Sequence, residues 1–408
     1  MKVLHINTND CRGGAAIAAF RLHEALLDEG IHSRMLVGKK YSSLTTIAEI
    51  PSYRLKKYFR FFSNSLSSHL GLNYANILDT FQLSNHPFLQ EADILHFHNL
   101  HGGYFNYLAL PFLTKKKPAV ITLHDMWAIT GHCAHSLSCE KWESGCGNCP
   151  YRNIYPKISL DLSAIEWRLK SWAFKKANVH IITPSLWLKE LVEKSFLKTK
   201  VCFHIPHFLD DAVFYPRDRK LCRQLLNLPQ DKSIILLGAE SFNSVFKGVE
   251  LLPKILKELE PLYQQLLILT IGNHPPESST ITNIPFRNFG YIEDDHLKSV
   301  LYSSADLFLI PSIAENAPLI ILENMACGTP AAGFKIGGIS ESVRNDETGI
   351  NRPFNDDQQL GRDMHQLLLN KNLLKSLSKN ASKFVKEVHG WENIQKQIKL
   401  YQERLNLS

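Results

Sequence analysis

Short apolar runs alternate with helical patterns along most of the chain, and this alternation constrains the fold more than any other feature. In the first half, a helical pattern with apolar residues between Ile17 and Leu27 stops at Gly30. The apolar runs themselves are residues 3–7, 33–37, 93–97, 119–123 and 179–183. Apolar runs separated by helices are typical of a parallel sheet covered on both faces. The pattern predicts an α/β fold with doubly wound, Rossmann-like sheets.

The alternation breaks at residues 205–216, where two prolines and a polar centre are typical of a linker between domains. It then restarts with strands over 234–237, 266–271 and 307–310 and helices over 249–259, 294–303 and 318–326. A chain of 408 residues is too long for one ordinary core. We expect two domains, residues 1–206 joined by a C-terminal helix over 391–408, and residues 207–390. Two such domains facing each other leave a ligand cleft between the carboxyl ends of their strands.

The composition excludes several classes of protein. Hydrophobic residues make up 44% of the chain, charged residues 21%, and the mean hydropathy is -0.14, as in soluble globular proteins. No run approaches the ~18–20 apolar residues that span a bilayer, and the opening run is too short for a signal peptide. We therefore expect a cytoplasmic protein with mostly reduced cysteines. A net charge of +7 is too small to mark a nucleic-acid binder, so no nucleic-acid partner is expected.

Two segments interleave basic and aromatic residues, namely 53–62 and 168–176. The favoured interpretation is a pair of amphipathic helices with aromatic inner faces and solvated outer faces. The alternative is a surface that attracts anionic lipid headgroups, because Lys and Arg stems can flank inserted aromatic rings. The alternative implies a peripheral location on the inner face of the plasma membrane.

Residues 311–330 carry the strongest signal for a binding site. A strand ends at Pro311, a loop carries Glu315, and a helix has Pro318 in its first turn, where a missing N–H costs little. The free N–H groups and positive dipole end of such a helix attract a diphosphate. Glu323 follows inside the helix, and if the residues from Glu315 onward were all helical, the two carboxylates would lie roughly 12 Å apart. That span is comparable to the distance from a hexose to a ribose across a diphosphate.

A lysine and several glycines fall at matching places in this half. Lys247 and Gly248 open the helix after the first strand of the second domain, where an ammonium group can neutralise a leaving diphosphate. Gly337 and Gly338 follow the strand after the second glutamate's helix and allow close backbone approach. The alternative that stays open is a pair of solvated surface glutamates.

The motifs of this half resemble those of the retaining family-4 glycosyltransferases. They are FKG at 246–248, GYIEDDHLKSVLYSSADLFLIPS, the Glu-x7-Glu pair, MACGTP and GGISESV. The resemblance implies the two-domain GT-B fold, with Glu315 on the donor sugar, Glu323 on the ribose and Lys247 on the diphosphate. It also implies further donor-binding positions, which are Ser244, Asn316, Ala317, Leu319, Ile320 and Gly14.

One departure from the family pattern concerns the diphosphate. The family usually has an Arg about five residues before the Lys, whereas residues 240–246 read ESFNSVF. Neutralisation of the diphosphate then depends on Lys247, on donors such as the Ser244 hydroxyl, and on helix N–H groups.

In the first half, His124 follows a predicted strand at its carboxyl end. A histidine satisfied inside the core is the alternative. The strings DILHFHNLHGGYFN at 93–106 and TLHDMWAITGHCAHS resemble a subgroup that assembles bacterial exopolysaccharide and O-antigen chains, including colanic-acid-type enzymes. The resemblance implies that His124 hydrogen-bonds the donor sugar and that His98 and Asn99 line the acceptor side.

Three other residues of the first half are assigned to the acceptor side or to the phosphate. Asp125 is expected to orient the imidazole of His124. Gly13 and Gly14 open the first helix and can admit an acceptor or a phosphate, although a simple tight turn explains them equally well.

Four of the eight cysteines lie within 17 residues, at Cys133, Cys139, Cys146 and Cys149. Their spacing favours a structural zinc with four thiolate ligands, for which His132 or His135 could substitute. Free thiols and disulfides are the alternatives.

These observations predict a retaining glycosyltransferase with His124, Glu315 and Lys247 as its catalytic residues. The donor is a UDP- or GDP-hexose, and the acceptor is a glycan or a lipid-linked oligosaccharide of a growing surface polysaccharide. No Asp-x-Asp motif occurs, so no metal or other cofactor is expected to be required for the chemistry. The alternatives are a sugar-nucleotide epimerase on the same fold and a non-catalytic subunit that binds a nucleotide sugar.

Overall fold

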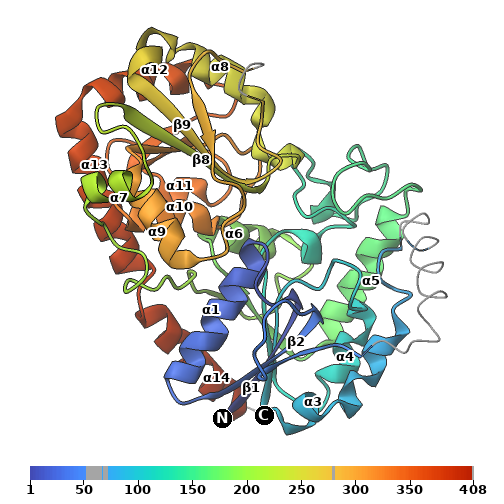
Figure 1. Cartoon of the computed structure of the whole chain (residues 1–408). Coiled ribbons are helices and arrows are strands. Elements are labelled where there is room, and N and C mark those ends of the chain that lie inside the picture. The colour runs from blue at the N-terminus through green and yellow to red at the C-terminus, as the bar shows by residue number, and fades with distance from the viewer. Residues whose placement is uncertain (52–66, 68–71, 278–280, 407–408) are drawn as a thin grey trace. The chain divides into compact units, whose positions relative to one another are not determined.

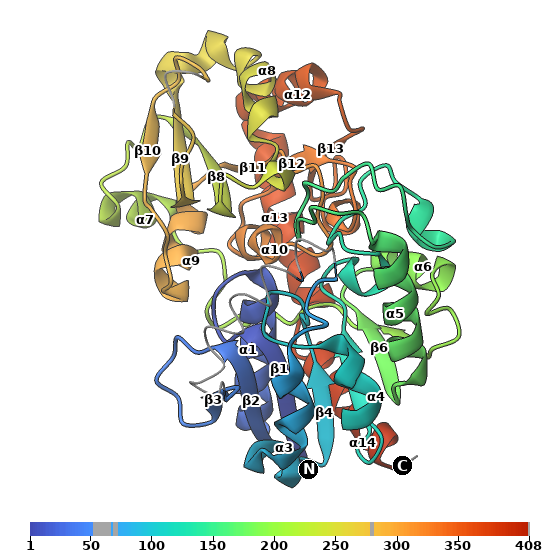
Figure 2. The ribbon, with the colours of Figure 1, turned by 90° about the vertical axis from the view of Figure 1, so that its right-hand side faces the viewer.

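The computed structural model describes residues 1–51, 67, 72–277 and 281–406. The chain divides into two units (Figures 1 and 2). The N-terminal unit comprises Met1–Phe208 with Glu392–Ser408, and the C-terminal unit comprises Leu209–Trp391. Within the described ranges, no helix combines the length and the apolar character that a membrane crossing requires.

The N-terminal unit contains a sheet of seven strands with the order β3-β2-β1-β4-β5-β6-β7. Every neighbouring pair is parallel. The strands are β1 (Lys2–Asn9), β2 (His32–Lys39), β3 (Ile47–Glu49), β4 (Ile94–Phe97), β5 (Ala119–Thr122), β6 (Val179–Thr183) and β7 (Cys202–His204). The strand order reverses between β1 and β4, so the connections after these two strands run to opposite sides and leave a crevice at their carboxyl ends.

Helices cover both faces of this sheet because its central strands are buried on both sides. On one face, Val3 and Ile94 pack against Leu26 of α1 and against Ile398 and Tyr401 of α14. The C-terminal helix α14 therefore belongs to the core of the N-terminal unit (Figures 1 and 2). The helices are α1 (Gly14–Asp28), α3 (Pro87–Glu91), α4 (Leu110–Leu113), α5 (Ser163–Lys176), α6 (Leu186–Lys194) and α14 (Glu392–Asn406).

The C-terminal unit repeats this plan with a sheet of six parallel strands, in the order β10-β9-β8-β11-β12-β13. The order reverses between β8 and β11, which makes their carboxyl ends the second switch point. The strands are β8 (Ser233–Ser241), β9 (Leu266–Asn273), β10 (Phe286–Asn288), β11 (Leu307–Ile310), β12 (Ala331–Phe334) and β13 (Gly349–Arg352). The helices are α7 (Arg219–Leu225), α8 (Leu252–Lys257), α9 (Asp295–Ser304), α10 (Leu319–Ala326), α11 (Ile339–Ser342), α12 (Asp357–Leu369) and α13 (Lys371–Val388).

Two predicted helices begin later than the sequence suggests. The helix predicted over 249–259 starts as a 3-10 turn, Val249–Leu251, and becomes the α-helix α8 only from Leu252. The helix predicted from Pro318 begins at Leu319, because Pro318 is its extended N-cap with ψ 114°. The prediction that this proline lies in the first turn was wrong by one position.

The two basic and aromatic segments have different outcomes. Residues 53–62 lie outside the described residues. Residues 168–176 lie on α5, but Lys170 is fully buried and does not share the outer face with the exposed Trp172. Its ammonium group donates to the carbonyl of Trp127 at 2.9 Å and lies 3.7 Å from the centre of that indole ring. Burial lowers the pKa of Lys170 to about 8, although the nearby Glu166 carboxylate opposes the shift. The run is therefore not a uniform basic surface.

A buried carboxylate ties three elements of the C-terminal unit together. Asp306, the residue before β11, accepts hydrogen bonds from the Arg223 guanidinium of α7 at 2.7 Å and from the backbone N–H of Ile234 in β8 at 2.7 Å. Arg219 adds a second ion pair at 3.1 Å. Arg223 is itself only 5% exposed, so the Asp306 carboxylate compensates the charge of a buried guanidinium.

We expect Asp306→Ala to lower the free energy of unfolding of the C-terminal unit by about 3–5 kcal/mol, because it leaves a guanidinium buried without its counter-charge. Urea unfolding followed by circular dichroism measures the change. The matched control is Asp211→Ala in the same unit, whose ion pair with Lys386 is largely exposed. The control should change the free energy by less than about 1 kcal/mol. Equal effects of the two substitutions would contradict the prediction.

Candidate functional site

The predicted donor-binding residues of the C-terminal unit follow β8 and β11, at the switch point of its sheet. The loop after β8 carries Lys247 in a 3-10 turn, Val245–Lys247, and the loop after β11 carries Glu315. The backbone joins the two loops, since the N–H of Ile313 donates to the carbonyl of Phe246 at 2.8 Å. The topology thus brings together residues 68 positions apart.

Lys247 and Glu315 form an ion pair, with 2.6 Å between Nζ and Oε1. The hydroxyl of Ser312 donates to the same carboxylate oxygen at 2.9 Å. The two charged side chains are 27% and 12% exposed. A partly buried pair of this kind keeps both charges oriented while leaving the ammonium accessible to an anion.

Two glycines let these loops approach neighbouring backbone. Gly248 has φ 62°, and a Cβ there would lie 1.9 Å from the carbonyl oxygen of Pro311. Gly337 has φ 51°, and a Cβ there would lie 1.8 Å from the carbonyl oxygen of Glu315. Both positions therefore require glycine, for the backbone conformation and for the space.

Glu323 lies inside α10 and is only 4% exposed. The phenol of Tyr302, from α9, donates to its Oε2 at 3.0 Å. The alternative of two solvated surface glutamates is therefore wrong. Glu315 is not helical, so the estimate of roughly 12 Å for a continuous helix does not apply. The sequence analysis did not predict the role of Tyr302, because no sequence pattern indicates that a tyrosine on one helix contacts a carboxylate on the next helix.

The N-terminus of α10 presents main chain rather than side chains at three of the predicted donor positions. Leu319 is buried, and Ile320 packs on β8, where a Cβ on Gly238 would lie 2.3 Å from its Cδ1. Ala317 precedes the N-cap and has only a methyl group. Backbone N–H groups at a helix start have no partner within the helix and are the groups that suit an anion, whereas Asn316 is a buried polar side chain.

Ser244 is the N-cap of the 3-10 turn that carries Lys247, and its carbonyl accepts from the Lys247 N–H at 3.0 Å. It is partly exposed. Ser244 therefore fixes the start of the turn that carries Lys247. This is the segment in which the family usually has an Arg before the Lys and this sequence has none.

At the switch point of the N-terminal unit, Gly13 and Gly14 connect β1 to α1. Gly13 has φ 83° and is the N-cap of the helix. A Cβ added at Gly14 would meet no atom within 4 Å. Gly14 is exposed, so the space beside it is open to solvent.

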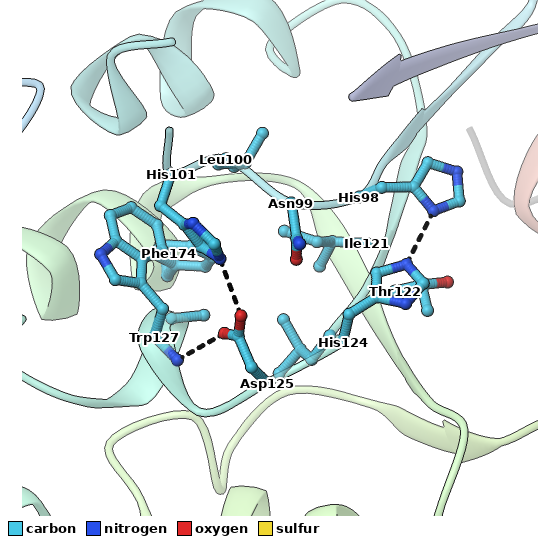
Figure 3. A pocket seen from close by; sticks show the side chains of 12 residues that line it. His98, Asn99, Leu100, His101, Ile121, Thr122, His124, Asp125, Trp127 and Phe174 are labelled. Carbon is cyan, nitrogen blue, oxygen red and sulfur yellow. Dashed lines mark hydrogen bonds and ion pairs between the residues drawn. The ribbon is translucent and has the colours of Figure 1, made fainter. Parts of the chain in front are cut away.

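His98 and Asn99 follow β4, His124 follows β5, and all three line one small pocket (Figure 3). His98 and His124 are joined by a hydrogen bond of 3.1 Å between Nδ1 and Nε2. Burial lowers the pKa of His124 to about 4, and the pKa of His98 also falls well below its usual value. Both rings are therefore neutral near pH 7.

Asp125 holds a different imidazole from the one expected. Its Oδ2 lies 2.7 Å from Nε2 of His101, and its Oδ1 accepts from the backbone N–H of Trp127 at 2.8 Å (Figure 3). These hydrogen bonds go to groups other than His124, but the Asp125 charge opposes the fall in the pKa of His124 that burial causes, and the expectation that Asp125 orients His124 stays a prediction. His101, whose Nδ1 lies 3.2 Å from the phenol of Tyr155, was missed although it lies inside the motif at 93–106.

The four clustered cysteines do not bring three ligand atoms within 4.8 Å of one another in the structure, and the zinc site there stays a prediction. All eight cysteines are free thiols in the structure, which also removes the disulfide alternative. Cys149 contacts His132 Nε2 at 3.2 Å, and Cys146 accepts from the Gly131 N–H. Over the described part of the chain, only three histidines of the sheet bring three metal-ligating atoms within 4.8 Å of one another. The thiols nevertheless interact, since the pKa of Cys133, raised mainly by burial, is raised further by Cys146 and Cys149.

Two family comparisons cover most of the chain. The family described as Glycosyltransferase Family 4 matches residues 12–213, and the family described as Glycosyl transferases group 1 matches residues 223–384. A protein of Escherichia coli (strain K12), named as a colanic acid biosynthesis glycosyl transferase, is 25% identical over 81% of this chain and 82% of its own length. An uncharacterized glycosyltransferase of Methanocaldococcus jannaschii is 35% identical over 54% of this chain and 58% of its own length.

Solved structures share the fold at low sequence identity. Sucrose-phosphate synthase from Thermosynechococcus elongatus has a TM-score of 0.72 at 18% identity and covers 100% of both chains. WaaG, a glycosyltransferase involved in lipopolysaccharide biosynthesis, has a TM-score of 0.66 at 17% identity and covers 97% of this chain and 98% of its own. With family matches in both units and a GT-B fold, this chain is a glycosyltransferase that belongs to family 4 in its N-terminal part and to group 1 in its C-terminal part.

Proposed function

We propose that the protein is a retaining glycosyltransferase that transfers a hexose from a UDP- or GDP-sugar to a growing, lipid-linked surface polysaccharide. The observation that carries this proposal is the Lys247–Glu315 ion pair beside the N-terminus of α10, with the buried Glu323 inside that helix. A cation, two carboxylates and helix N–H groups at one switch point suit a nucleotide diphosphate sugar.

In the proposed donor site, the diphosphate interacts with the Lys247 ammonium and with the amides at the start of α10. These groups stabilise the negative charge that develops as the diphosphate leaves. Glu315 accepts hydrogen bonds from sugar hydroxyls and Glu323 from the ribose. We expect no metal in the donor site. An Anabaena protein of the same fold, with a TM-score of 0.66 at 14% identity, was solved with UDP-glucose, which supports this class of donor.

The proposed reaction breaks the bond between the anomeric carbon and the diphosphate oxygen, and the electron pair leaves with the diphosphate. The acceptor hydroxyl forms the new bond on the same face, so the configuration is retained. Its proton passes to the departing phosphate. His124 is the proposed sugar contact from the N-terminal unit, and exclusion of water from the site limits hydrolysis of the donor.

The acceptor is proposed to lie along the N-terminal unit, at a surface lined by Gly13, His98, Asn99 and Asp125. The Escherichia coli relative named for colanic acid biosynthesis supports a polysaccharide acceptor. On α5, the basic and aromatic residues that are exposed and available for an anionic membrane surface are Arg168, Trp172, Lys175 and Lys176. We propose a cytoplasmic location, peripheral to the inner face of the plasma membrane.

We expect one nucleotide series among UDP, GDP and ADP to raise the melting temperature of the protein, and Lys247→Ala to reduce that rise. Stabilisation by a ligand follows its concentration relative to Kd, so removing a phosphate contact shrinks it. Thermal unfolding with and without each nucleotide makes the measurement. The matched control is Lys257→Ala, which removes an exposed lysine of the same unit. An undiminished rise in Lys247→Ala would remove the lysine from the donor site.

Glu323→Gln should weaken the discrimination between the preferred nucleoside diphosphate and its 2′-deoxy analogue by about tenfold, because a carboxylate that accepts hydroxyl hydrogen bonds is replaced by a neutral amide. Isothermal titration calorimetry gives the two Kd values. Glu250→Gln, at an exposed position of the same unit, is the control and should keep the discrimination. If Glu323→Gln discriminates as well as the wild type, Glu323 is not the ribose ligand.

A further inference from the structure

Histidines gather on one face of the N-terminal sheet, near its switch point. His5 of β1 lies directly opposite His96 of β4 in the strand register, and His98 follows two positions later on the same face. The three side chains are 0%, 0% and 3% exposed. Such a row of buried imidazoles is more than a core needs for packing, since each ring must satisfy two nitrogens.

A continuous chain of hydrogen bonds runs from His5 through His98 to His124. His5 Nδ1 lies 3.0 Å from His98 Nε2, and His98 Nδ1 lies 3.1 Å from His124 Nε2. Figure 3 shows the second of these bonds at the edge of the pocket. His96 is held separately, by the Tyr401 phenol at 2.6 Å and the Thr122 hydroxyl at 2.8 Å.

The hydrogen-bonded row of His5, His98 and His124 can hold its protons in only two arrangements. Burial lowers the pKa of His5, His98 and His124, so all three rings are neutral near pH 7. A neutral imidazole donates through one nitrogen and accepts through the other. All the protons in the chain therefore point either toward His124 or away from it.

His5, at the end of this hydrogen-bonded row away from His124, distinguishes the two arrangements. Nε2 of His5 is buried and has no hydrogen-bond partner among the described residues. If the protons point away from His124, this atom carries an N–H group that is buried without an acceptor. If they point toward His124, it carries only an unused lone pair. Unsatisfied buried N–H groups are rarer than under-used acceptors.

We propose that His5 and His98 are positioning residues that fix the tautomer of His124. His5 donates from Nδ1 to His98, His98 donates from Nδ1 to His124, and His124 carries its proton on Nδ1. If the proposed function holds, His124 then acts toward the sugar as a hydrogen-bond donor, and the ligand atom it selects is a hydroxyl oxygen acting as acceptor.

A metal ion explains the cluster less well, although ring nitrogens of His5, His96 and His98 lie within 4.8 Å of one another. Five of their six nitrogens already have hydrogen-bond partners. The rings of His96 and His98 are also stacked, with centroids 4.1 Å apart and planes inclined by 29°. Stacked rings direct their in-plane lone pairs side by side rather than toward one ion.

The test is ¹⁵N NMR of histidine-labelled protein at pH 7, because the chemical shift of each ring nitrogen reports whether it carries a proton. His98→Asn and His124→Asn assign the signals. In the wild type without ligand, we expect His98 and His124 each to favour the Nδ1–H form by about tenfold or more. The opposite tautomer, or an even mixture, at either residue would overturn the proposal even if no transfer reaction has been found. Stoichiometric metal in the purified protein, detected by elemental analysis, would also overturn it.

Two substitutions of His5 separate positioning from packing. His5→Leu removes the donor and should abolish the tautomer preference of His98, whereas His5→Asn restores an N–H group near the Nδ1 position and should retain the preference. His23→Gln is the matched control, because this buried histidine of the same unit is hydrogen-bonded to Ser33 and Thr46 and not to the rings of His5, His98 and His124. An unchanged preference in His5→Leu would show that His5 does not set the tautomer. If that variant fails to fold, the wild-type spectrum still decides.

Discussion

Both units depend on the same constraint, a parallel sheet whose strand order reverses beside its first strand. The reversal sends neighbouring connections to opposite sides, so main-chain amides and side chains after two adjacent strands converge where no helix covers them. In the C-terminal unit this brings Lys247 to Glu315, and in the N-terminal unit it brings His98 to His124. The chemistry of each candidate site follows from this convergence.

Charged side chains in both units are stabilised by nearby partners rather than by exposure to solvent. Asp306 neutralises a buried guanidinium, and the Lys170 ammonium finds carbonyl oxygens and an indole ring. The same physics applies at the candidate donor site, where Glu315 holds the Lys247 ammonium. A proposed diphosphate competes for a lysine that is already oriented, so less side-chain ordering is needed on binding. The histidines His5, His98 and His124 differ from these charged groups. Burial keeps their rings neutral, and hydrogen bonds alone orient the rings.

The sequence by itself determined the class of fold and the family. The period of apolar runs requires a parallel α/β sheet, and motifs such as MACGTP mark the glycosyltransferases independently of side-chain geometry. The pattern was less reliable at the ends of elements. Pro318 shows why, because a proline fits both an N-cap and a first turn, and only the observed ψ distinguishes them.

Only the tertiary structure decided which partners meet. It assigned Asp125 to His101, gave Glu323 the phenol of Tyr302, and joined His5 to a chain that reaches His124. Each of these contacts links residues on different elements, and hydrogen bonds between elements depend on register and packing that no local pattern encodes. The sequence determines which chemical groups stand at the strand ends, and the packing of the sheets and helices determines what each group touches.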